Sequence, residues 1–108
     1  VLFLGLTFKE DVPDLRNSKS FEIISFLKKK KHTIKLHDPF VKSDDLEMVN
    51  LKKIKNNSFD AFILAVPHKF YLQRIDFIKT FLKSDGFCFD IKGKVNFKKD
   101  KNLNYWSL

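Results

Sequence analysis

Residues 1–6 read Val-Leu-Phe-Leu-Gly-Leu, a run without polar side chains and without any alternation of polar and apolar positions. Such a run is typical of a strand buried on both faces, as in a parallel sheet. A second run of this kind, Ala-Phe-Ile-Leu-Ala-Val, fills residues 61–66 and is closed by Pro67. The sequence therefore predicts two central strands of a parallel sheet.

The segments that follow these two runs have helical spacing. From Ser18, apolar residues recur at helical intervals up to the lysine run of residues 28–31, which predicts a helix with Ser18 as its N-cap. Residues 68–83 carry a broad apolar face, which predicts one helix, or two with a break near Gln73, with the phenylalanines as core. Two further strands are expected at residues 33–37 and 87–91, the latter after a turn at residues 84–86.

The remaining segments give weaker signals. Residues 40–58 are polar, and Leu46 and Val49 favour a short helix there, alone or followed by a weak strand. The tail after residue 91 is rich in lysine and asparagine and has an aromatic anchor at Tyr105-Trp106. Strands that alternate with helices form parallel pairs through right-handed crossovers. We therefore expect an α/β fold, Rossmann-like and three-layered (α/β/α) with a mainly parallel sheet, in a single domain over residues 1–108.

The composition sets limits on the class of protein. Of the 108 residues, 44% are hydrophobic and 31% charged, which excludes collagen-like and generally disordered chains. The single cysteine, Cys88, excludes an internal disulfide and favours a cytoplasmic setting. No signal peptide and no apolar run of the ~20 residues that span a bilayer is present. The three histidines and the acidic residues show no metal-ligand spacing, so we expect no metal site.

The chain is strongly basic, with 21 Lys and Arg residues against 13 Asp and Glu residues and a formal net charge of +8. This charge makes a basic nucleic-acid-binding α/β module one alternative. Arg16 and Arg74 are the only arginines, however, whereas recognition of phosphates and bases usually uses the guanidinium fork. The lysine run also suits the C-terminal end of a helix, where cations face the carbonyl end of the dipole.

The connection between the first strand and the first helix, Thr7 to Asn17, is longer than the usual two to six residues of a βα loop. Phe8 supplies an aromatic surface, and Lys9 and Arg16 supply cations close to a helix N-terminus, where anions bind readily. A phosphorylated small molecule fits such a loop. The alternative is that Lys9 and Arg16 only pair with the acidic residues of the loop, which are Glu10, Asp11 and Asp14. Gly5 stands without a glycine-rich fingerprint, and no Walker-type loop is present, so the chain is not a self-sufficient dinucleotide site.

Several motifs of the chain resemble one enzyme family. Residues 5–11, Gly-Leu-Thr-Phe-Lys-Glu-Asp, and residues 13–18, Pro-Asp-Leu-Arg-Asn-Ser, resemble the opening of the C-terminal, UDP-binding domain of UDP-glucose/GDP-mannose dehydrogenases. Leu36-His37-Asp38-Pro39, residues 60–69 and Phe89-Asp90-Ile91-Lys92-Gly93 follow in the family's order. The Ala-Val-Pro-His-Lys and Asp-Ile-Lys-Gly stretches resemble the branch that oxidises UDP-N-acetylhexosamines.

The resemblance implies a function for the complete enzyme. It would oxidise the C6 alcohol of a UDP-sugar to a carboxylate by two NAD-dependent hydride transfers, through a thiohemiacetal on a catalytic cysteine, for polysaccharide biosynthesis. By the same resemblance Phe8 and Lys9 contact the nucleotide sugar, Lys92 holds the UDP where many relatives have arginine, and Arg16 approaches NAD across the interdomain cleft.

The family's NAD-binding domain, central dimerisation helix and catalytic Cys, Lys and Asp are absent from residues 1–108. We therefore expect a part of a longer, homo-oligomeric enzyme that has no turnover alone and contains no catalytic residue. Cys88, between Phe87 and Phe89, is expected to be a buried, inert thiol. A third alternative is an interaction domain that has kept the fold without the ligand.

Three polar residues at strand ends are expected to have structural roles. His37 and His68 each follow a strand, and lone histidines without a partner carboxylate are more often surface or packing residues. Asp38 occupies the place where Rossmann folds hold a ribose hydroxyl, but next to Pro39 it is interpreted as a turn residue.

Overall fold

The computed structural model describes residues 1–16, 18–42, 48–95, 97 and 103–107; Leu46, part of the expected short helix, lies outside this range. The described chain forms a five-stranded parallel sheet in the order β2-β1-β3-β4-β5. The strands are β1 (Leu2–Leu4), β2 (Lys35–His37), β3 (Phe59–Leu64), β4 (Leu82–Asp90) and β5 (Leu103–Ser107). The expected α/β fold with a parallel sheet is confirmed.

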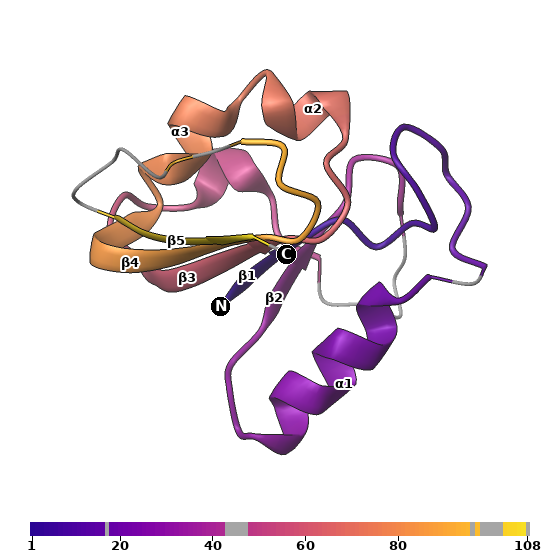
Figure 1. Cartoon of the computed structure of the whole chain (residues 1–108), viewed down its shortest axis with the longest axis horizontal. Coiled ribbons are helices and arrows are strands. Elements are labelled where there is room, and N and C mark those ends of the chain that lie inside the picture. Colours follow the sequence, from indigo (N-terminus) through magenta and orange to yellow (C-terminus); the bar gives the residue numbers. More distant parts are fainter. Residues whose placement is uncertain (17, 43–47, 96, 98–102, 108) are drawn as a thin grey trace.

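The helices lie on both faces of this sheet (Figure 1). On one side lie the 3-10 helix η1 (Leu51–Lys53) and the α-helices α2 (Lys69–Leu72) and α3 (Ile75–Lys79), and on the other lies α1 (Ser20–Lys29). The three-layer arrangement is therefore present. None of the helices in the described part of the chain is long and apolar enough to cross a membrane.

The alternation of side chains along the strands divides the core into two clusters. Leu2, Leu4, Phe62 and Leu64 face the side of α2 and α3, where they meet the buried Tyr71, among others. Phe3 and Ile63 face the other side, where they meet Ile24 of α1. Because β1 is buried over all three of its residues, it needs apolar side chains on both faces, as its sequence predicted.

The structure corrects two predicted boundaries. The expected turn at Ser84-Asp85-Gly86 is wrong, because β4 runs through these residues. Their turn-forming character is visible only as a positive φ of 61° at Asp85 and as a register shift in the pairing of β3 with β4. Helix α1 begins at Ser20 and has Lys19 as its N-cap, whereas Ser18 accepts a hydrogen bond from the Ser20 amide at 3.2 Å.

Two predictions for the second half of the chain are confirmed only in part. Residues 69–79 form two short helices with a break at Gln73 and Arg74, as expected, but Leu82 and Lys83 belong to β4 and not to a helix. The phenylalanines of residues 68–83 are not all core, however, because Phe77 is 46% exposed while Phe81 is buried. The tail contributes more than an anchor, since it adds β5 in parallel to β4 and leaves Trp106 60% exposed at the sheet edge.

Candidate functional site

The strand order places a crevice at the carboxyl ends of β1 and β3. From β1 the chain continues to β2, which lies on one side of β1 in the sheet. Strands β3 and β4 lie on the other side of β1, so the connections that follow β1 and β3 run in opposite directions along the sheet. Open α/β sheets bind ligands at such a switch point. A pocket of about 270 Å³ opens there. Its walls come from four places: the end of β1, the start of α1, the end of β3 and the residues after β4, namely Thr7, Phe8, Lys19, Ser20, Ile23, Ala65, Val66, Ile91 and Lys92.

Gly5 shapes the base of this crevice. Its φ is +100°, and a Cβ atom added there would lie 2.6 Å from the Cβ and the amide nitrogen of Val66. Glycine is thus required both by the backbone conformation and by the close approach of the chain after β3. The Ser20 hydroxyl donates to the Gly5 carbonyl at 2.9 Å and ties the first turn of α1 to the end of β1.

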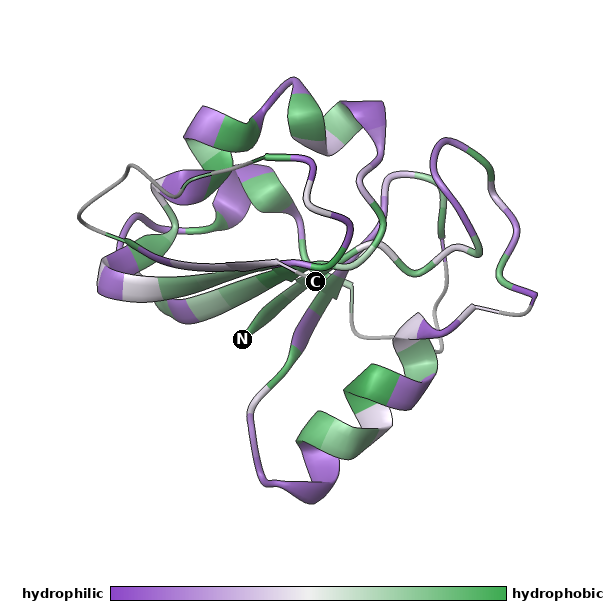
Figure 2. Ribbon diagram, viewed as in Figure 1, coloured by the Kyte–Doolittle hydropathy of each residue, from purple (hydrophilic) through white to green (hydrophobic). Residues whose placement is uncertain are grey.

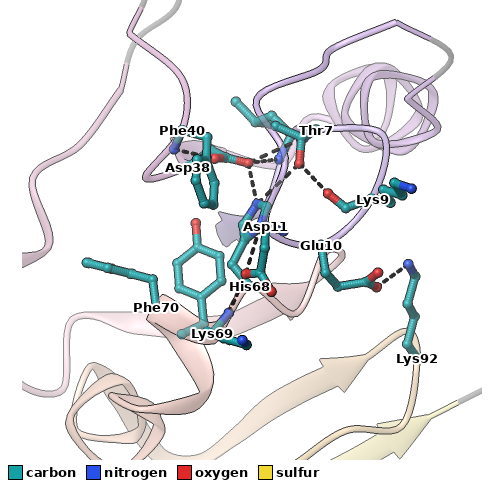
Figure 3. Close-up of polar contacts among 12 residues, drawn as sticks. Thr7, Lys9, Glu10, Asp11, Asp38, Phe40, His68, Lys69, Phe70 and Lys92 are labelled. Atoms are coloured by element: carbon teal, nitrogen blue, oxygen red, sulfur yellow. Dashed lines mark hydrogen bonds and ion pairs between the residues drawn. The ribbon is translucent and has the colours of Figure 1, made fainter.

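A hydrogen-bond cluster fixes the loop that follows β1; it consists of the buried Thr7, Asp38 and His68 and the exposed Asp11 (Figure 3). His68 is fully buried; its Nδ1 accepts a hydrogen bond from the Asp11 amide at 2.8 Å, and its Nε2 lies 2.9 Å from Asp38 Oδ2. This pattern assigns the neutral tautomer in which Nε2–H donates to Asp38 and Nδ1 accepts. A single imidazole therefore joins the loop to the end of β2.

Asp38 connects the same cluster to the backbone of β1. Its Oδ2 accepts from the Leu6 amide at 2.7 Å and from the Thr7 amide at 3.3 Å, and its Oδ1 accepts from the Phe40 amide at 2.8 Å. Burial by itself would raise the pKa of Asp38, but the hydrogen bonds from His68 and from these amides outweigh burial and lower it. The carboxylate thus stays ionised while buried.

This cluster corrects two expectations. Asp38 is a buried anchor of the first loop in addition to being a turn residue, and His68 has a partner carboxylate in Asp38. The separation of 30 residues hid this pairing in the sequence. The sequence offered one signal for this pairing, the position of the two residues. Asp38 follows β2 and His68 follows β3, and the carboxyl ends of these two strands lie on either side of β1 at the same edge of the sheet.

Two of the four predicted ligand-binding residues line the pocket. Phe8 comes from the first loop and is 50% exposed, and Lys92 comes from the chain after β4. The Lys92 ammonium pairs with the Glu10 carboxylate, and this hydrogen bond lowers the pKa of Glu10. The structure thus brings the last motif of the chain against the first loop.

The other two predicted residues lie outside the pocket wall. Lys9 is exposed, its side chain points away from the His68 cluster, and its ammonium has no ion-pair partner among the described residues (Figure 3). Arg16 has a side chain that is 87% exposed, and its guanidinium donates to both Asp14 oxygens at 3.1 Å. Of the two cations, Arg16 therefore pairs with an acidic residue of the loop, whereas Lys9 pairs with none among the described residues.

The remaining candidates from the sequence have packing roles. His37 Nδ1 lies 2.8 Å from the Tyr71 hydroxyl, which donates to the His37 carbonyl, also at 2.8 Å. Cys88 is buried as expected, and burial raises the pKa of its thiol to about 12, which keeps it protonated and unreactive. Among the described residues, no group of three or more His, Cys, Asp or Glu side chains could hold a metal ion.

Comparison with known proteins agrees with this geometry. Residues 2–97 match the model of the UDP-glucose/GDP-mannose dehydrogenase family, UDP binding domain. Protein CapL of Staphylococcus aureus is 36% identical over 99 residues, which cover 86% of this chain and 23% of that protein. The UDP-N-acetyl-D-glucosamine 6-dehydrogenase of Salmonella typhi is 31% identical over 97 residues, which cover 85% of this chain and 23% of that protein.

A solved structure supports the fold. The NDP-N-acetyl-D-galactosaminuronic acid dehydrogenase of Methanosarcina mazei Go1 superimposes with a TM-score of 0.79 at 22% identity, covering 98% of this chain and 24% of that one. The chain therefore spans about a quarter of the length of the proteins that it matches. Because the family model covers nearly the whole sequence, the chain belongs to the UDP-glucose/GDP-mannose dehydrogenase family, of which it forms the UDP-binding domain.

Proposed function

We propose that residues 1–108 are the C-terminal, UDP-sugar-binding domain of a longer NAD-dependent dehydrogenase that oxidises C6 of a UDP-N-acetylhexosamine to the uronate. The observation that carries the proposal is the pocket at the switch point, where Phe8 and Lys92 meet the start of α1. The names of the relatives, which include a UDP-N-acetyl-D-glucosamine 6-dehydrogenase, supply the substrate class. Family membership favours this function over the nucleic-acid-binding and ligand-free alternatives.

The diphosphate of the substrate would lie among the cations of this pocket. The Lys92 ammonium is already at the wall, and the amides of the first turn of α1 attract anions. Lys9, whose ammonium is unpaired within the described residues, adds a point charge that can swing towards the phosphates. Phe8 offers its half-exposed ring as an apolar surface for the nucleotide sugar.

The residues of this chain do not fit a main binding site for NAD. The open side of Gly5 is filled by Val66, so the backbone there cannot approach a pyrophosphate as a glycine-rich turn does. We therefore assign the dinucleotide to the remainder of the longer protein, with Arg16 as the contribution of this domain. NAD would serve there as the hydride acceptor, and the nucleophilic cysteine would also come from that remainder, because the Cys88 thiol is buried and protonated.

The setting follows from the same assignment. The longer protein would work as a homo-oligomer in the cytoplasm, where NAD and UDP-sugars are available and a free thiol persists. The domain itself would bind and orient the substrate without any catalytic residue of its own. Its product, a UDP-linked uronate, is suited to polysaccharide biosynthesis.

The test is substrate binding by the full-length protein, measured by calorimetry with a UDP-N-acetylhexosamine. We expect Lys9→Ala and Lys92→Ala each to raise the dissociation constant about tenfold, the equivalent of about 1.4 kcal/mol. Lys92→Arg keeps a cation at the wall and should retain most of the affinity. The matched control is Lys28→Ala, an exposed lysine at the other end of α1, which should bind like wild type. Unchanged affinity in both alanine variants of the site would contradict the assignment.

A further inference from the structure

The first loop contributes a carboxylate next to the pocket that the proposed function assigns to a diphosphate. The Lys92 ammonium donates a hydrogen bond to Glu10 Oε1 and forms an ion pair with it (Figure 3). Lys92 is a wall residue of the pocket, whereas Glu10 is not among the residues that line it. The cation that the proposed function assigns to the phosphates is therefore occupied by an anion of the same chain.

The backbone that carries Glu10 is anchored by the residue that follows it. The Asp11 amide donates to His68 Nδ1 at 2.8 Å, and the Asp11 carboxylate accepts from the Lys69 amide, also at 2.8 Å. These bonds tie the loop to the chain after β3. The Glu10 carboxylate therefore changes partner by rotation of its own side chain, without a movement of the loop.

The backbone that carries Lys92 is held from the interior of the domain. Asp90 is fully buried, and its Oδ2 accepts from the Val95 amide at 2.8 Å and from the Tyr105 hydroxyl at 2.6 Å. The Asp90 carbonyl accepts from the Gly93 amide at 3.2 Å, which closes the turn around Lys92. Because a lysine side chain has a flexible four-carbon stem, its ammonium can leave one oxygen for another while this turn stays in place.

The ion pair is exposed enough to be exchanged readily. The Lys92 and Glu10 side chains are 40% and 33% exposed, and ion pairs at such positions contribute little to stability. Figure 2 shows hydrophilic residues along the loop that carries Glu10, in contrast to the apolar strand β1 that precedes the loop. A carboxylate that leaves Lys92 is therefore solvated where it stands.

We propose that Glu10 sets the affinity of this pocket for a diphosphate, because its carboxylate competes with the phosphate oxygens for the Lys92 ammonium. The inference rests on the proposed function, in which the pocket binds a UDP-sugar. The diphosphate carries two negative charges against one on the carboxylate, and the start of α1, whose amides attract anions, lies in the same pocket wall. The phosphates therefore displace Glu10, and part of their binding free energy is spent on breaking the pair.

The first test compares dissociation constants for a UDP-N-acetylhexosamine by calorimetry on the full-length protein. Glu10→Gln removes the competing charge, and we expect it to lower the dissociation constant about fivefold. In the Lys92→Ala background, Glu10→Gln should change the constant by less than about twofold, because no ammonium remains to compete for. Unchanged affinity in the single variant Glu10→Gln would overturn the proposal. Weaker affinity would also overturn it, since the carboxylate would then orient the ammonium for the phosphates.

The matched control for charge removal is Asp60→Asn. Asp60 forms an exposed ion pair with Lys83 at 3.2 Å, and it lies near the start of β3, whereas the pocket lies at the carboxyl end of that strand. This variant also loses one carboxylate from an exposed pair and should bind the UDP-sugar like wild type. An equal gain of affinity in Asp60→Asn would assign the effect to net charge and overturn the proposal.

The second test detects the exchange of partners directly. A water-soluble carbodiimide joins a carboxylate and an amine that are in contact through an amide bond, and peptide mass spectrometry quantifies the products. In the full-length protein we expect a Glu10–Lys92 product that falls at least fivefold with saturating UDP-sugar, while an Asp60–Lys83 product stays constant. A Glu10–Lys92 product that persists with bound ligand would overturn the proposal, as would its absence without ligand. Calorimetry on the same protein separates the two hypotheses, because failure to bind the UDP-sugar would count against the proposed function instead.

Discussion

At the residue scale, the four ligand-binding candidates separate into two environments. Phe8 and Lys92 are part of the pocket wall, whereas Lys9 and Arg16 lie on the surface outside it, where Asp14 holds Arg16. An exposed ion pair of this kind contributes little to stability, so the guanidinium can leave Asp14 for a phosphate at little cost. Arg16 is therefore available to a ligand that approaches from outside the domain.

Replacement of this guanidinium tests the proposed division of labour. In the full-length enzyme we expect Arg16→Ala to raise the NAD concentration at half-maximal rate by about tenfold, because one charge-assisted contact to a phosphate is lost. The dissociation constant of the UDP-sugar should stay within twofold. Initial rates at varied NAD, together with calorimetry for the sugar nucleotide, measure the two effects, and equal losses for both ligands would argue against separate roles.

His68 is the residue on which the conformation of the first loop depends most. Its imidazole satisfies the Asp11 amide on one side and Asp38 on the other. We expect His68→Leu to lower the free energy of unfolding by roughly 2–3 kcal/mol, since the part-buried Asp11 amide and the buried Asp38 carboxylate each lose a partner.

The same variant should also weaken UDP-sugar binding, because Phe8 and Lys9 belong to the loop that the imidazole holds. Urea unfolding of the full-length protein measures the stability, and calorimetry measures the affinity. His32→Leu, at an exposed position, is the control and should change neither by more than about 0.5 kcal/mol. Wild-type stability and affinity in His68→Leu would show that the loop does not depend on the cluster.

His37 makes the stability of the domain depend on pH. Burial lowers its pKa from 6.5 to about 4, against the opposing effect of the nearby Asp38 carboxylate. The native state therefore resists protonation, while the unfolded chain takes up the proton first as the pH falls. The free energy of unfolding is therefore unaffected by His37 above pH 6.5, and it falls progressively between pH 6.5 and pH 4, by up to roughly 3 kcal/mol. Unfolding curves at several pH values should show a shallower decline for His37→Gln than for wild type; parallel declines would contradict this.

At the element scale, the conformation at the end of β1 depends on the close contact of the Gly5 backbone with Val66 after β3. Gly5 and Gly93 both have positive φ, but a Cβ at Gly5 would clash with Val66, whereas one at Gly93 would meet only Ser107 at 3.9 Å. We expect Gly5→Ala to cost about 3 kcal/mol or more, from backbone strain and overpacking together. Gly93→Ala, which suffers only the strain, should cost about 1 kcal/mol.

Thermal unfolding of the two glycine variants measures this difference. A larger shift of the transition for Gly5→Ala would show that the approach of the chain after β3 sets the crevice. If the two variants shifted it equally, the contact with Val66 would be irrelevant.

The elements also show where local signals were overruled. Ser84, Asp85 and Gly86 have strong turn propensity, yet they lie within β4, where Gly86 pairs with Leu103 of β5 and the Asn104 side-chain amide donates to the Asp85 carbonyl at 2.8 Å. The ladder absorbs their irregularity as a register shift near Phe59. Tertiary pairing outweighs local propensity at this position.

At the scale of the whole molecule, the two faces of the sheet differ in completeness. The side of η1, α2 and α3 buries a large cluster that includes Tyr71 and Phe81, whereas on the side of α1 the described part of the chain leaves Phe87, Phe89 and Trp106 exposed on β4 and β5. This asymmetry agrees with a domain that works as a part of a longer protein, as the proposed function requires. The net charge of +8 suits the dianionic nucleotide sugar of the proposed function.

The sequence by itself determined the layered parallel sheet and the family. Its unbroken apolar strands, its helical spacing and the motif of residues 5–18 depend on neighbours along the chain, and such patterns can be recognised without coordinates. The partnership of Asp38 with His68, the pairing of Lys92 with Glu10 and the exposed row of Phe87, Phe89 and Trp106 were decided only by the tertiary structure. The physical reason is that strand order and register, which join residues far apart in sequence, determine which side chains share an edge or a face.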